Sequence, residues 1–305
     1  MPIVYLPGSI LQAQLYNNAA NNLNSIWAVG TGSNGYGQPP QSTVAVGQLI
    51  RATDGDTIRT VINSASLHQG TTLPSIPFPL PVVGELIIYN ANISPAISAV
   101  TTNELNCSAT GTDIVVSGVR TAPWGGGVSI PTVRSTITMT FASYDKMRYF
   151  FNTGGTFRIS CSSGAGTGTP QDILWTTLCS GMGTLSMPAV STTQIIVGTS
   201  YTGLKQLGGT IAPTLLVASG FYNLTATPTQ LFEQVDGGVY GGDSISIVYN
   251  TVGSSVIATI LFEETNNQTI DGTLTVVATA RPSETTYIAN TWGTPTITVT
   301  SPVTL

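Results

Sequence analysis

The sequence predicts a mainly β protein, in which a sandwich-like C-terminal body follows a small N-terminal helical docking module. Short alternating segments rich in β-branched residues fill the chain from Val133 onward, and Gly-rich turns separate them. Regularly spaced short strands with such turns favour a sandwich or a barrel. The first part of the chain carries two amphipathic helix patterns instead. We therefore expect a helical anchoring module at 1–72, a Pro/Gly-rich linker with a small β region at 73–132, and a β-sandwich-like domain at 133–305.

The first helix pattern covers residues 9–30. Its apolar residues recur at spacings of three and four, which places them on one face of an α-helix: Leu11, Leu15, Ala19, Leu23, Ile26 and Trp27. Ser9 is an N-cap candidate, and Gly30 is a candidate stop. We expect this apolar face to contact a neighbouring protein.

A second helix is predicted after the loop at 30–42, which is dense in Gly, Asn, Pro and Ser. The run TDGD at 53–56 resembles a capping box, and apolar residues follow at helical spacing up to Ala65. The pattern ends near His68 and Gly70. Two short helices and a long loop bury little surface by themselves, so this module is expected to pack against something else.

The linker begins with four prolines within residues 73–81, which favours a stiff extended segment. Short strands are expected at 86–89 and 114–119, and the run WGGG at 124–127 predicts a turn.

The body is predicted to contain many short strands and two short helices. The helices are expected at 145–152 and 170–179. The strands are expected at 135–141, 156–160, 194–197, 229–232, 244–249, 256–262, 272–279, 286–288 and 296–300.

Charge is scarce in this chain. Charged residues make up 8% of the sequence, against roughly 25% in an average soluble domain. The net charge is −5, and no cluster of Lys or Arg is present that would neutralise several phosphates, so nucleic-acid binding is not expected. A neutral, hydroxyl-rich surface has little repulsion to keep copies apart, which suits a protein inside an assembly. A neutral secreted β protein is the alternative. Neither a membrane span nor a signal peptide is expected.

Catalytic and metal-binding patterns are weak. The single histidine, His68, has no nucleophile motif beside it, so a capping or interface role is expected. The adjacent Glu263 and Glu264 would point to opposite faces of a strand. The loop between Asp236 and Asp243 is a candidate cation site, but it lacks the dense ligand spacing of a calcium loop. We expect no enzyme activity, no cofactor and no metal.

The three cysteines are widely spaced and contain no CxxC pair: Cys107, Cys161 and Cys179. Buried free thiols are expected, with one disulfide pair as the alternative.

The run MRYFFNTGGTFRIS at 147–160 resembles a segment of virion structural proteins of tailed bacteriophages, particularly cyanophage-like ones. The same resemblance extends to Trp175, LFEQ at 231–234, YGGDSIS at 240–246, DGTLT at 271–275 and RP at 281–282. At the N-terminal end it includes GTG at 30–32, GYGQ at 35–38 and HQ at 68–69, whereas 74–133 is unmatched.

The resemblance implies a structural component of the virion, associated with the tail, neck or baseplate, and acting through protein–protein contacts in an oligomer. Its partners would be other virion proteins and copies of itself, with a trimer as the candidate state. A receptor-binding tail fibre or adhesin is the alternative, which would add a host surface receptor. A head decoration protein and a tail-associated glycan hydrolase rank below these. The expected interface residues are Leu15, Leu23, Ile26, Trp27, Tyr36, Arg148, Tyr149 and Phe151.

Overall fold

The chain, seen in a computed structural model, is mainly β with antiparallel sheets and five α-helices in its described part. The structure describes residues 13–45, 48, 50–74, 89–127, 132–164 and 166–305. The chain divides into two compact units. Unit 1 comprises Met1–Thr110, Arg148–Gly154 and Ser283–Trp292, and unit 2 comprises Gly111–Met147, Gly155–Pro282 and Gly293–Leu305. The division is therefore not the linear one expected from composition, because two short segments from the C-terminal part of the chain belong to unit 1.

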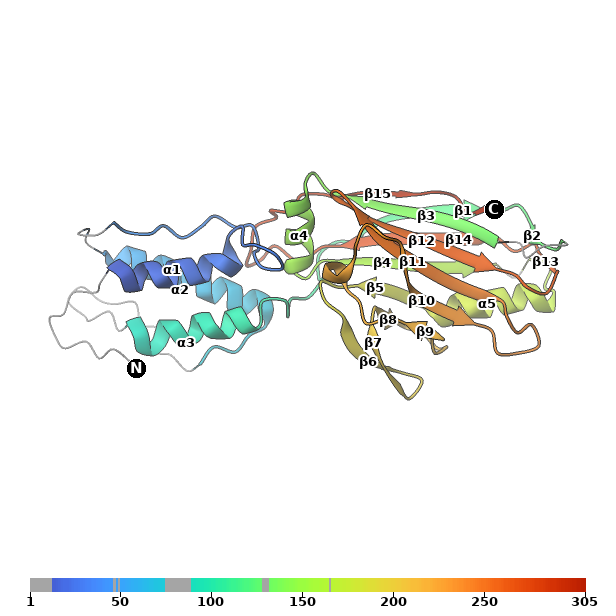
Figure 1. The fold of residues 1–305 in the computed structure, drawn as a ribbon, viewed down its shortest axis with the longest axis horizontal. Coiled ribbons are helices and arrows are strands. Elements are labelled where there is room, and N and C mark those ends of the chain that lie inside the picture. The colour runs from blue at the N-terminus through green and yellow to red at the C-terminus, as the bar shows by residue number, and fades with distance from the viewer. Residues whose placement is uncertain (1–12, 46–47, 49, 75–88, 128–131, 165) are drawn as a thin grey trace. The chain divides into compact units, whose positions relative to one another are not determined.

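Unit 1 contains three packed helices, α1 (Ala13–Trp27), α2 (Ala52–Gln69) and α3 (Tyr89–Thr102) (Figure 1). The first two were predicted, although Ser9 and Leu11 lie outside the described residues. The third was not predicted. Its apolar side chains nevertheless recur at helical spacing and are buried: Ile93, Ala96, Ile97 and Val100.

The strand expected at 86–89 is wrong at its last residue, because Tyr89 begins α3. The other three residues of that prediction lie outside the described residues, as does most of the proline-rich segment at 73–81. Pro95 lies inside α3 and obscured its pattern, since proline removes a helical hydrogen bond and is rare in helix interiors.

Helix α2 ends at Gly70 as predicted, but it begins earlier than the capping box expected at 53–56, because Arg51 is the N-cap and Asp54, rather than Asp56, is the acidic residue that caps it. The backbone N–H of Arg51 donates to the Asp54 carboxylate at 2.8 Å, which satisfies a donor at the helix N-terminus. At the other end Gly70 adopts a left-handed conformation, with a φ of 65°, and its N–H donates to the carbonyl of Leu67. Glycine pays no Cβ penalty there.

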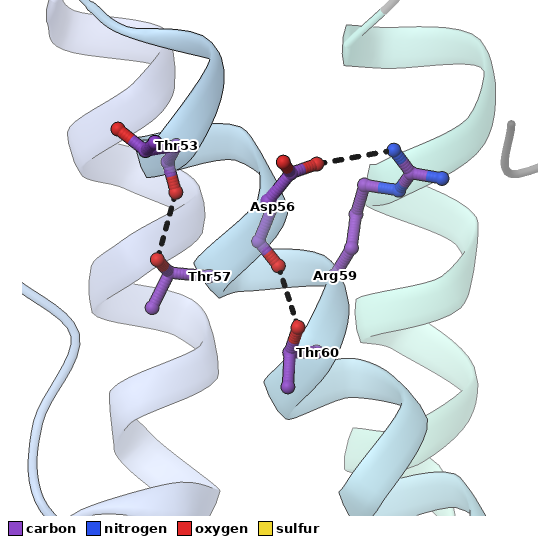
Figure 2. Close-up of polar contacts among 5 residues, drawn as sticks. All are labelled: Thr53, Asp56, Thr57, Arg59 and Thr60. Carbon is purple, nitrogen blue, oxygen red and sulfur yellow. Dashed lines mark hydrogen bonds and ion pairs between the residues drawn. The ribbon is translucent and has the colours of Figure 1, made fainter. Parts of the chain in front are cut away.

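Figure 2 shows the polar contacts within the first half of α2. The hydroxyls of Thr57 and Thr60 donate back to the carbonyls of Thr53 and Asp56, at 2.8 and 2.9 Å. Arg59 Nη1 lies 3.5 Å from the Asp56 carboxylate. This pair is partly buried, with side-chain exposures of 14% for Arg59 and 37% for Asp56, and an i, i+3 pair on a helix contributes roughly 0.2–0.5 kcal/mol.

Unit 2 contains two large antiparallel sheets (Figure 1). The five-stranded sheet has the order β1 (Ile114–Arg120), β14 (Leu274–Arg281), β4 (Thr156–Ser163), β5 (Thr184–Met187) and β8 (Lys205–Leu207). The seven-stranded sheet has the order β15 (Thr296–Val299), β3 (Thr132–Thr140), β12 (Ser255–Glu263), β11 (Ser244–Val252), β10 (Thr229–Val235) and β9 (Leu215–Leu216), with β16 (Val303–Thr304) also paired to β3.

Smaller elements complete the architecture. Two two-stranded sheets pair β2 (Trp124–Gly125) with β13 (Thr269–Ile270) and β6 (Thr192–Ile196) with β7 (Thr199–Gly203). The remaining helices are α4 (Tyr144–Asn152), α5 (Pro170–Met182) and the 3₁₀ turn η1 (Phe221–Asn223). Both short α-helices expected in the body are confirmed.

Strand alternation was the most informative sequence signal. In β12 and β14 every second side chain is buried, as a sheet with one face on the core requires. The strand expected at 286–288 is wrong. That stretch belongs to unit 1, where the Ala289 N–H and carbonyl bond the side-chain amide of Gln38 rather than another strand.

Helix α5 packs against β4 of the five-stranded sheet and against β10 and β11 of the seven-stranded sheet. Its inward residues include Trp175, whose ring lies 4.7 Å from that of Trp124 and 6.1 Å from that of Phe262, measured between centroids. All three rings are buried. The core of unit 2 is therefore formed by both sheets together with α5. None of the described helices is both long enough and apolar enough to cross a membrane.

Candidate functional site

Seven of the eight expected interface residues form part of the interior of unit 1. Leu15 is half-buried, and the others are buried: Leu23, Ile26, Trp27, Tyr36, Arg148, Tyr149 and Phe151. The apolar face of α1 thus packs against its own chain. This burial is a correction to the expectation of an exposed stripe, because α2, α3 and the segments at 148–154 and 283–292 supply the apolar surface that a partner was expected to supply.

Arg148 holds the loop that follows α1. Its guanidinium donates to the backbone carbonyls of Val29, Gly32 and Asn34 at 2.8–3.1 Å. The planar fork of arginine can reach several acceptors at once, which a lysine cannot. Asn152, one turn further along α4, donates to the carbonyl of Gly35 at 2.8 Å. The aromatic run at 147–155 therefore acts as a scaffold for this loop.

A buried polar network lies at the end of the same loop. Tyr36 donates through its hydroxyl to the carbonyl of Glu104 at 2.5 Å and accepts from the Gln69 amide at 2.8 Å. The N–H of Gly35 donates to the Glu104 carboxylate at 2.7 Å. Burial raises the pKa of Glu104 to about 7, and raises that of the nearby Cys107 thiol to about 12. The network joins the loop to α2 and α3.

His68 has no geometry for catalysis. Its Nε2 donates to the Thr153 carbonyl at 3.0 Å, so that nitrogen carries the proton and cannot serve as a base toward the Ser283 hydroxyl at 3.4 Å. Both side chains are buried. Burial lowers the pKa of His68, which keeps the ring neutral. These contacts are those of a structural histidine.

The carboxylates of unit 2 are engaged by protein donors. Asp243 accepts from Gln171, from the Thr265 N–H and hydroxyl, and from the Asn266 amide. Glu263 and Glu264 diverge as expected, with Glu264 fully buried and Glu263 half-exposed. Across the described residues no group of three or more His, Cys, Asp or Glu side chains could hold a metal ion.

A groove of about 470 Å³ lies between α1 and α3. Its lining combines hydroxyl and amide side chains with a few apolar ones: Leu15, Asn18, Ala19, Asn22, Ser25, Ser94, Ile97, Ser98, Thr101 and Thr102. It contains no charged side chain, so it offers no strong orienting contact to an ionic ligand.

The outward side of the seven-stranded sheet carries a continuous uncharged surface, which we call the neutral face. Registered pairs place its side chains in neighbouring rows: Thr136, Thr138 and Thr140 of β3, Val248, Asn250 and Val252 of β11, Ser255, Ile257 and Thr259 of β12, and Thr296 and Thr298 of β15. These side chains are half-exposed or exposed. Opposite them, the inward residues such as Ile137, Ala258 and Ile260 form the core.

On the same side of the seven-stranded sheet, charged side chains of the described strands lie toward one end. Glu233 and Arg134 occupy the next row, on either flank of Ser246 and Leu261. The neutral face was not predicted as a unit because its strands come from distant parts of the chain, as where Thr138 of β3 lies opposite Ile257 of β12 on one side and Thr298 of β15 on the other. The signal was nonetheless present, as the polar positions of the alternating strands are Thr and Ser rather than Lys and Glu.

No family model matches this chain, and neither a curated protein nor a solved structure matches it.

Proposed function

We propose that this protein is a structural component of a tailed-phage virion, associated with the tail, neck or baseplate, and that it works through protein–protein contacts in an oligomeric assembly. In this proposal unit 2 is a sandwich-like body, the N-terminal helices belong to a docking module, and the protein resides in the virion. The resemblance of 147–160 to virion proteins supplies the biological setting. The neutral face supplies the physical support.

The neutral face suits burial against another protein. Burying a charged side chain without a partner is costly, so the cores of interfaces are depleted of charge. The hydroxyls of the neutral face are short and partly satisfied within the sheet, as in the 2.8 Å contact between Thr140 and Ser255. A face of this kind can be covered with a small desolvation cost, whereas a typical solvated sheet face would present Lys and Glu.

The adhesin alternative receives less support. Stacking on a receptor glycan would call for exposed aromatic side chains on a β face, and the outward positions of the two large sheets carry none among the described residues. A hydrolase also lacks support, because His68, the residue weighed for catalysis, is buried and hydrogen-bonded within the protein.

The first experiment tests the biological setting. Mass spectrometry of purified phage particles, before and after tails are separated from heads, should find this protein in the tail or neck fraction at a fixed ratio to the other proteins there. Absence of the protein from particles would overturn the virion proposal. A fixed ratio in the head fraction would instead place it among head decoration proteins.

The second experiment tests the neutral face. The double variant Thr138→Lys, Thr259→Lys places two charges at the centre of that face, and it should weaken self-association or binding to virion partners at least tenfold in analytical ultracentrifugation. The matched control is Ser117→Lys, an exposed position on the outward side of β1 in the other sheet. Equal association of both variants and the wild type would show that the neutral face is not the interface.

A further inference from the structure

Two cysteine thiols lie together in the interior of unit 2. Cys161 belongs to β4, and Cys179 belongs to α5. Both are free thiols, and both are buried, at 8% and 1% relative exposure. Nothing in the proposed function uses them.

The packing of α5 on β4 aligns these two residues. Cα atoms of the two elements approach within 8 Å, and the Thr176 hydroxyl donates to the carbonyl of Ser163 at 3.0 Å. Cys179 is one helical turn beyond Thr176, so it lies on the same side of α5. Cys161 is two residues before Ser163, so it lies on the same side of β4. Cys161 and Ser163 are both on the buried side of β4, and Cys179 is on the buried side of α5, so the two thiols lie on the sides of β4 and α5 that pack together.

The titration of Cys161 agrees with this placement. Its pKa is raised well above the usual range, first by the hydrogen bond with the Cys179 thiol and then by burial. The two thiols are thus in hydrogen-bond contact with each other. A thiol with a raised pKa is a slow nucleophile, which explains how the pair can remain reduced inside a cell.

We infer that Cys161 and Cys179 are a dithiol that closes into an intramolecular disulfide when the protein meets a small disulfide oxidant. One thiolate attacks the oxidant's S–S bond and releases one thiol. The second thiolate then attacks the resulting mixed disulfide, releases the second thiol and forms the Cys161–Cys179 bond. Two electrons and two protons pass to the oxidant in total, which leaves as two thiols.

The cross-link would join a central strand of the five-stranded sheet to the helix that packs between the sheets. Closing the loop 161–179 restricts the unfolded chain, so the oxidised protein should unfold at a higher temperature than the reduced one. The disulfide would stabilise the protein after its release from a reducing cell, since disulfides persist in oxidising surroundings. The inference is independent of which partners the protein has.

The test uses the whole chain in a glutathione redox buffer at mildly alkaline pH, followed by acid quenching and alkylation under denaturing conditions. The tryptic peptide 159–205 contains both thiols and no internal Lys or Arg, whereas Cys107 is on a different peptide. Oxidation should yield this peptide unalkylated and lighter by two hydrogen atoms, while Cys107 is alkylated. The melting temperature of the chain should rise, and it should not change in oxidised Cys179→Ser.

Three outcomes would overturn the inference: alkylation of all three cysteines after oxidation, a glutathione adduct on 159–205 without ring closure, or a disulfide that includes Cys107. If Cys179→Ser does not fold, the mass of the wild-type peptide still decides the question. A virion assignment that fails would leave this result unaffected, since the readout is a covalent bond in the isolated chain.

Discussion

Tyr36 and Glu104 are joined by a short hydrogen bond, in which the buried phenol donates to the backbone carbonyl of Glu104 at 2.5 Å. The neighbouring Gly35 N–H donates to the carboxylate of the same residue at 2.7 Å. This pairing holds the loop after α1 against the end of α3, and it places an acidic side chain where water is excluded.

Glu104 should make stability depend on pH. Its folded pKa of about 7 is above the ordinary value of 4.5, so its stabilising contribution is complete below pH 4.5 and is lost as pH rises through about 7. The loss is up to about 1.4 kcal/mol per pH unit within that window. Glu104→Gln keeps an acceptor for Gly35 without a charge. In urea unfolding, it should match the wild type near pH 5 and exceed it near pH 8.

His68 makes stability depend on pH in the opposite direction to Glu104. The effect of Glu104 is therefore measured as the difference between the wild type and Glu104→Gln. The pKa of His68 is lowered by burial, so its contribution is present above the ordinary value of 6.5 and is lost as pH falls. The difference between wild type and Glu104→Gln cancels this term. Glu263→Gln, at a half-exposed position in unit 2, is the control for loss of one negative charge. A constant difference between Glu104→Gln and wild type from pH 5 to pH 8 would contradict the assignment.

Arg148 should be among the most sensitive positions in unit 1. Arg148→Met retains much of the apolar stem but leaves the carbonyls of Val29, Gly32 and Asn34 without the guanidinium donor. Since each buried acceptor left unpaired costs about 1–3 kcal/mol, we expect a loss of roughly 3–5 kcal/mol in the free energy of unfolding. Arg148→Lys should recover only part of it, because one ammonium cannot reach all three acceptors. Full recovery with lysine would show that charge alone matters.

Gly37 should tolerate no side chain. Its φ is 71°, and a Cβ there would overlap the ring of Tyr149. Gly37→Ala should therefore destabilise the protein by more than the ~1–2 kcal/mol that a left-handed backbone costs an L-residue. The matched control is Gly32→Ala, with a φ of 62° and open space around the added carbon. Equal losses in thermal unfolding would argue that only the backbone conformation matters at Gly37.

Val197 should be a position where a substitution stabilises. It is a β-branched residue with a φ of 47° in the turn between β6 and β7, and its side chain is 66% exposed. Asparagine tolerates the left-handed region better, so Val197→Asn should raise the free energy of unfolding by about 0.5–1 kcal/mol. Val252→Asn, at an exposed valine in strand β11, should be neutral or destabilising. Loss of stability at Val197 would contradict the strain interpretation.

The sequence by itself determined the elements whose pattern is local. Alternation predicted β3, β4, β11, β12 and β14, and helical spacing predicted α1, α2, α4 and α5, because side-chain periodicity reports which face of an element is buried. It also determined the scarcity of charge, from which a neutral surface follows. Helix α3 was not predicted, although its apolar residues recur at helical spacing, because it contains Pro95 and proline is rare inside helices.

Only the tertiary structure decided which segments belong together. Glu104, Gln69 and Arg148 gave no signal as partners of the loop at 29–36, since hydrogen bonds between residues distant in the chain leave no trace in local spacing. The same holds for the neutral face, whose rows are set by strand register, and for the thiols of Cys161 and Cys179. Periodicity identifies a buried face but not the face that covers it. That choice depends on how the elements of the whole chain pack, which explains why the apolar stripe of α1 was assigned to a partner and is instead covered by its own chain.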